Sequence, residues 1–117
     1  MTANKKTVER YMSAFRIHDH AGVLACLTDD VVWHIPGAFT KRGKAEFDKE
    51  IENDAFEGKP DINVTRLTEE GDVVVAEGTV LAHKKGGEPF RLAFCDVFEM
   101  QDGLISKLIS YLMTLPG

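Results

Sequence analysis

Four segments rich in β-branched and aromatic residues follow one another in the second half of the chain, and they constrain the fold more than any other feature. Three short turn signals separate them at hairpin spacing: Glu70-Gly71-Asp72, Lys85-Gly86-Gly87 and Gln101-Asp102-Gly103. Consecutive hairpins form an antiparallel meander. The sequence therefore predicts strands over residues 62–67, 73–83, 90–100 and 104–113.

The first half of the chain has helical periodicity instead. Residues 7–15 carry apolar side chains at the i, i+3, i+4, i+7 spacing of an amphipathic helix. Asp19 can cap a second short helix, and Gly43 begins a third that ends at Gly58-Lys59-Pro60. A strand is expected over residues 31–35, between the second and third helices.

Helices followed by a meander indicate the α+β class, with three N-terminal helices packed on one face of a curved antiparallel sheet. This arrangement encloses a cone-shaped space, which we expect to hold both the hydrophobic core and a ligand pocket. The chain has 117 residues, close to the usual size of one domain, so we expect a single domain over residues 1–117.

Composition and charge exclude several classes of function. Nineteen acidic against 14 basic residues give a formal net charge of −5, which argues against nucleic-acid binding because phosphates require a basic face. No apolar run approaches the ~20 residues that span a bilayer, and the polar N-terminal sequence is no signal peptide. We therefore expect a soluble cytoplasmic protein without a membrane partner, in which Cys26 and Cys95 are reduced.

Asp96 is the most informative residue of the predicted strand 90–100. Because side chains alternate between the faces of a strand, Asp96 shares a face with five apolar side chains: Phe90, Leu92, Phe94, Phe98 and Met100. A buried ionised carboxylate is costly, so Asp96 either pairs with a donor or stays protonated. Two interpretations remain open: a structural acid satisfied by a backbone or hydroxyl donor, or a neutral acid that donates a hydrogen bond to a ligand oxygen.

Tyr11 is the natural companion of Asp96, because it lies in the apolar stripe of the first helix. A buried phenol needs a partner for its hydroxyl. A phenol and a protonated acid that converge on one oxygen form an oxyanion hole for an enolate or phenolate. The alternative is a core tyrosine whose hydroxyl reaches the surface.

The segment ERYMSAFRIHDHAGVLACLTDDVVWHIPG, followed by a helix, a meander and DVFEMQDGLI, resembles the NTF2-like superfamily. The nearest resemblance is to the SnoaL-like polyketide cyclases and ketosteroid isomerase, and it covers essentially the whole chain. It implies a cone-shaped α+β roll, usually a homodimer through the outer face of the sheet. It also places Tyr11 on the oxyanion-hole tyrosine of the isomerase and Asp96 on the protonated acid beside it.

The resemblance fails at one catalytic position. The aspartate that shuttles the proton in the isomerase precedes the turn after the first strand, and this chain has Ile35 there. His34 is adjacent, but alternation directs it to the opposite face, so we expect a hydrogen-bonded structural residue. The related limonene epoxide hydrolase uses an Asp-Arg-Asp arrangement, which this chain does not match at Phe94 or at Ser110 and Tyr111.

Other candidate residues follow from strand parity and apolar character. Glu77 has two open interpretations, a second acid in the cavity or the polar side of its strand. His18, Asp19 and His20 fit a capped, solvated turn better than a metal site, and no metal or cofactor is expected. The candidate walls of the pocket are Phe15, Trp33, Ile35, Phe94, Phe98 and Met113.

Together these observations predict a pocket for a small, mostly apolar molecule with one carbonyl or phenolic oxygen held by Asp96 and Tyr11. The first functional hypothesis is an isomerase or cyclase that works through an enolate. The alternative is a non-catalytic ligand-binding or dimerisation module. Ile35 favours the module, and the embedded Asp96 favours the enzyme.

Overall fold

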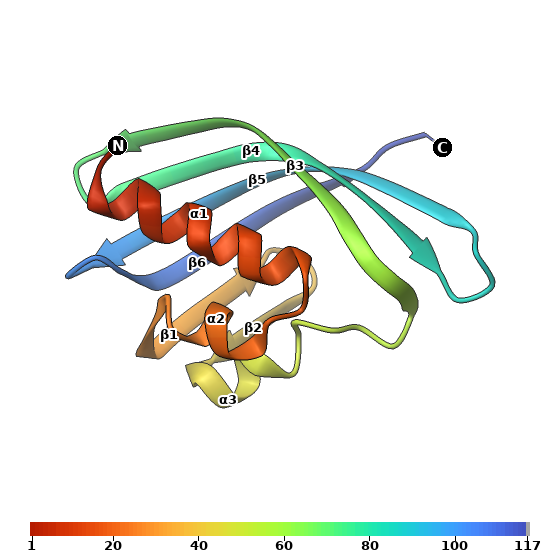
Figure 1. The fold of residues 1–117 in the computed structure, drawn as a ribbon, viewed down its shortest axis with the longest axis horizontal. Helices are drawn as coiled ribbons and strands as arrows, with labels where there is room; N and C mark the ends of the chain where they lie inside the picture. The colour runs from red at the N-terminus through yellow and green to blue at the C-terminus, as the bar shows by residue number, and fades with distance from the viewer. Residues whose placement is uncertain (117) are drawn as a thin grey trace.

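The computed structural model describes residues 1–116, and Figure 1 shows its helices on one side of an arched sheet. The helices are α1 (Ala3–Arg16), α2 (His20–Leu24) and α3 (Gly43–Asp48). The strands are β1 (Leu27–Ile35), β2 (Phe39–Arg42), β3 (Phe56–Glu70), β4 (Val73–Lys84), β5 (Pro89–Gln101) and β6 (Leu104–Thr114). The α+β class predicted from the sequence is confirmed.

The six strands form a single sheet in the order β2-β1-β6-β5-β4-β3. The predicted antiparallel meander is present as β3 to β6. The expectation of an entirely antiparallel sheet is wrong, because β1 pairs in parallel with β6. β2 and α3 separate β1 from the meander in the chain, and such a long connection allows the strand to pair in either direction.

The hairpin between β5 and β6 follows directly from its turn residues. Asp102 and Gly103 have φ angles of 52° and 78°, and they connect Gln101 to its partner Leu104. A two-residue loop with both central residues at positive φ is the turn whose twist matches that of the strands, and Asp-Gly is a preferred pair for it.

The first half differs from the sequence prediction in three places. The strand expected over residues 31–35 begins earlier, at Leu27, and β2 was not predicted. The third helix is shorter than expected and ends at Asp48. Of the two apolar residues beyond its end, Ile51 is buried and Ala55 is exposed. The residues expected to end that helix, 58–60, lie inside β3, where the pairing with β4 is irregular.

Alternation along the strands places the core between the sheet and α1. On β5, Phe94, Asp96, Phe98 and Met100 are buried, whereas Arg91 and Glu99 on the other face are exposed. Val8, Tyr11 and Met12 of α1 pack onto this face of the sheet, which is the concave face in Figure 1. Among the described helices, none has the length and apolar character that a membrane crossing needs.

Candidate active site

A cavity of about 170 Å³ lies between α1 and the concave face of the sheet. Its walls come from α1, β1 and the three strands β4, β5 and β6, with one residue from β3. They include six residues singled out from the sequence: Tyr11, Phe15, Trp33, Ile35, Phe94 and Asp96. Among the lining residues in the described part of the chain, Asp96 is the one carboxylic acid.

Asp96 is buried, with 9% of its surface exposed, and its Oδ1 atom has no hydrogen-bond partner within residues 1–116. Burial raises the pKa of the carboxyl from 3.8 to about 7, and a side-chain hydrogen bond with Ser110 acts in the opposite direction. Desolvation disfavours the charged form of an acid. Near neutral pH a large fraction of Asp96 therefore carries a proton that it can donate.

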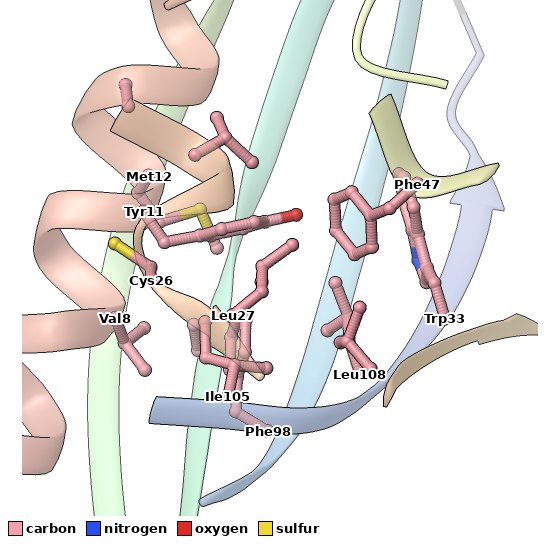
Figure 2. Close-up of a cluster of buried hydrophobic side chains, with 14 of the residues drawn as sticks. Val8, Tyr11, Met12, Cys26, Leu27, Trp33, Phe47, Phe98, Ile105 and Leu108 are labelled. Carbon is pink, nitrogen blue, oxygen red and sulfur yellow. The ribbon is translucent and has the colours of Figure 1, made fainter. Parts of the chain in front are cut away.

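Tyr11 is 2% exposed, so the alternative of a hydroxyl that reaches the surface is wrong. Figure 2 shows the ring extending from α1 into the interior, with its hydroxyl oxygen directed toward Phe47 and Trp33. Burial raises the pKa of Tyr11, and the charges of Asp96 and Cys26 raise it further. The phenol is therefore a neutral donor across the physiological range.

Trp33 connects the wall of the cavity to β6. Its ring stacks on Phe47 with centroids 4.6 Å apart and meets Phe15 edge-on at 6.1 Å. Its indole N–H donates to Ser110 Oγ over 3.0 Å. These contacts on both sides of the indole hold the wall in one position.

Gly78 provides the space for another wall residue. It lies opposite Phe94 in the pairing of β4 with β5. A Cβ at position 78 would lie 2.8 Å from the Phe94 ring and would also contact the carbonyl oxygen of Asn63. The absent side chain therefore lets the aromatic ring lie flat across the strand and line the cavity.

Three of the predicted site residues lie outside the cavity. Phe98 is fully buried in the core, where its ring packs against Tyr11 with centroids 5.5 Å apart. Met113 is 68% exposed, on the outer side of β6. Glu77 lies on the outer face of β4 and forms an ion pair with Arg66, so its alternative interpretation as the polar side of the strand is correct.

His34 and His20 have structural partners. His34 bonds the Thr40 hydroxyl over 2.8 Å between β1 and β2, as expected for a residue on the opposite face from Ile35. Asp19 caps α2 by accepting from the Gly22 N–H, as predicted. His20 bonds Asp48 through Nδ1 and Glu52 through Nε2. These bonds connect α2 to α3 and to the loop that follows it.

Sequence reasoning did not assign Ser110 and Leu112 to the cavity, although both line it. They share the face of β6 that looks toward α1, and Ser110 is directly opposite Asp96. The available signal was Ser110 itself, a hydroxyl residue among apolar residues of β6 that lies opposite the acid on β5. It could be used only once the register of the two strands was known.

The arrangement is suited to one kind of chemistry. Tyr11, a neutral phenol, and Asp96, which is largely protonated below pH 7, both line a small apolar cavity, where hydrogen bonds to a developing oxyanion are stronger than in water. At position 35, Ile35 lines the cavity and offers no basic atom. A ligand oxygen in this cavity would meet these two O–H groups, and the described lining residues include no second carboxylate.

Such a fold and cavity define the NTF2-like class of small α+β pocket proteins. The family model of the SnoaL-like domain matches residues 8–108, and the chain belongs to this family. No match was found among curated proteins.

Solved structures agree on the fold. An NTF2-like protein of unknown function from Burkholderia pseudomallei K96243 is similar, with a TM-score of 0.89 and 26% identity over 97% of this chain and 92% of that one. An epoxide hydrolase of the LEH type from M. tuberculosis has a TM-score of 0.83 and 24% identity over 95% and 83%. TerC, co-crystallised with polyporic acid, has a TM-score of 0.85 and 24% identity over 93% and 90%.

Proposed function

We propose that this protein is an isomerase or cyclase for a small apolar carbonyl or phenolic compound, and that Asp96 and Tyr11 hold the reacting oxygen as an enolate forms. The observation that carries the proposal is the Asp96 carboxyl, buried in the wall of an apolar cavity with Oδ1 unpartnered among the described residues. A buried polar atom without a partner is uncommon, and a ligand oxygen would satisfy it.

The size of the cavity limits the ligand. A volume of about 170 Å³ is below the ~300–1,000 Å³ of typical pockets for drug-sized molecules. A compound with a single ring therefore fits, and a fused four-ring steroid does not. The apolar walls select a neutral ring with its one oxygen toward Asp96.

The alternative is a binding module without catalysis, and one observation favours it. Ile35 occupies the wall position at which a general base is expected, and general bases contribute ~10²–10⁴-fold to rate. In this alternative Asp96 and Tyr11 bind the same oxygen, but no proton leaves carbon.

Two measurements test these proposals in order. First, a fluorescent single-ring phenol is titrated against the wild type, Asp96→Ala and the control Glu99→Gln, which changes an exposed acid on the other face of β5. The proposal expects weaker binding in Asp96→Ala only, and equal binding in all three proteins contradicts it. Second, hydrogen–deuterium exchange at the acidic carbon of a bound single-ring ketone separates enzyme from module. Exchange above the solvent background supports the enzyme, and its absence leaves the binding module.

We further propose that the protein is a cytoplasmic homodimer through the outer face of the sheet. The resemblance to NTF2-like proteins implies this interface. Val75, Val97 and Ile109 on this face are only partly buried, and Tyr111 and Met113 are exposed. Apolar side chains grouped on a solvent face favour association.

A further inference from the structure

A chain of three buried side chains runs from the β1 wall to the acid. Trp33 Nε1 donates to Ser110 Oγ over 3.0 Å. An indole N–H can only donate, so the Ser110 oxygen is the acceptor in this bond. The single proton of the Ser110 hydroxyl therefore remains available for another acceptor.

The neighbouring acid offers such an acceptor. Ser110 is directly opposite Asp96 in the pairing of β5 with β6, and it is 3% exposed. The side-chain hydrogen bond between them lowers the pKa of Asp96, as a donor to a carboxylate does.

The other elements around Asp96 offer no competing charge. Tyr11 on α1 is a neutral phenol, and the partner of Asp96 on β4 is Ala76. Cys95 lies on the opposite face of β5, where burial raises the pKa of its thiol and favours the neutral form. Ser110 is therefore the polar group that can favour one orientation of the Asp96 carboxyl over another.

Resting on the function proposed above, we propose that Ser110 is a positioning residue, whose hydroxyl, held by Trp33, orients the Asp96 carboxyl so that Oδ1 is presented to the ligand oxygen. Trp33 then has two roles, as a wall of the cavity and as the donor that prevents the hydroxyl from rotating. The arrangement leaves one carboxyl oxygen engaged by the protein and the other free for the ligand.

The test is the pKa of Asp96 in the ligand-free protein, followed by the ¹³C shift of its carboxyl and assigned with Asp96→Asn. Ser110→Ala should raise this pKa by ~1 unit, because a donor to the charged form is lost. Ser110→Thr should restore it, since the hydroxyl returns. Ser106→Ala is the matched control, because Ser106 lies on the same strand and bonds the backbone carbonyl of Glu99.

Trp33→Phe provides a second variant if Ser110→Ala does not fold. It keeps an aromatic ring and removes the N–H, so it should move the pKa of Asp96 in the same direction by a smaller amount.

Phenol binding should weaken by about tenfold in Ser110→Ala and recover in Ser110→Thr. An unchanged pKa in both Ser110→Ala and Trp33→Phe overturns the positioning role, as does a failure of Ser110→Thr to restore it.

The design separates this inference from the function on which it rests. The pKa is measured without any ligand, so a change of the pKa in Ser110→Ala reports on the contact between Ser110 and Asp96 and not on ligand binding. If the pKa shifts as expected but the wild type binds no phenol, the proposed function fails while the contact stands. If Asp96→Ala loses binding but Ser110→Ala changes neither pKa nor affinity, the function stands and the positioning role is overturned.

Discussion

The indole of Trp33 lies stacked on the ring of Phe47, with centroids 4.6 Å apart and planes inclined by 27°. Through this contact α3, a helix of only six residues, packs against Trp33, a wall residue of the cavity (Figure 2). Phe47 is fully buried and also meets Tyr11 edge-on at 6.1 Å. A core residue therefore supports two residues of the candidate site.

Replacing Phe47 should be among the most destabilising single changes in the protein. We expect Phe47→Ala to lower the free energy of unfolding by about 3–5 kcal/mol, because a large buried ring leaves a cavity. Urea denaturation followed by tryptophan fluorescence measures the change, and Phe47→Leu should cost less. A loss under about 1 kcal/mol would show that α3 does not pack as described.

The titration of Asp96 should make stability depend on pH in an unusual direction. Its pKa is raised from 3.8 to about 7 on folding, so the folded state holds the proton more tightly than the unfolded state does. The stabilisation is complete below pH ~4 and is lost as pH rises toward 7, by up to roughly 4 kcal/mol. Urea midpoints of the wild type and Asp96→Asn between pH 4 and 8 measure it. Parallel pH dependences in the two proteins contradict the prediction.

A carboxylate introduced at position 35 should supply the missing base. Ile35 lines the cavity, so Ile35→Asp places an acceptor near the carbon of a bound ketone. We expect deuterium exchange at that carbon to rise by ~10²-fold or more. His34→Asp is the matched control, because the His34 side chain bonds Thr40 on the other face of β1. Equal rates in the two variants would refute this placement of position 35.

His20 should stabilise the protein mainly on the acidic side of neutrality. Its hydrogen bonds with Glu52 and Asp48 raise its pKa above 6.5. A raised histidine pKa means that the stabilisation is complete below pH ~6 and is lost as pH rises through the pKa of the folded state. Thermal midpoints of the wild type and His20→Gln should therefore differ at pH 6 and converge by pH 9. A constant difference across this range would mean that the charge of His20 is not involved.

The proposed dimer predicts a change in mass when the outer face becomes charged. Tyr111 and Met113 are exposed on this face of β6, so Tyr111→Lys with Met113→Lys removes apolar contact area and leaves the core intact. Sedimentation should find a dimer for the wild type and a monomer for the double variant. A wild-type monomer contradicts the proposal.

The architecture and half of the residues that line the cavity could be predicted from the sequence. Period-two alternation alone placed Phe94 and Asp96 on the inner face of β5, and helical spacing placed Tyr11 and Phe15 toward them. Met113 could not be placed in this way, because alternation divides β6 into two sets of residues and only the pairing with β5 shows that Met113 belongs to the outer set. The sequence also left open whether Glu77 faces the cavity or the outside. Its ion pair with Arg66 on β3 shows that it lies on the outer face of the sheet.

The sequence by itself determined the class of fold and the buried face of β5, because these depend on local periodicity and on turn residues. Only the tertiary structure decided which side chains meet across the strands. The Asp102-Gly103 turn alone would place Asp96 opposite Ile109, but a register shift between Glu99 and Met100 places it opposite Ser110. A shift of one residue exchanges the faces of a strand. The irregularity between Glu99 and Met100 therefore places the Ser110 hydroxyl, and not the apolar side chain of Ile109, opposite Asp96.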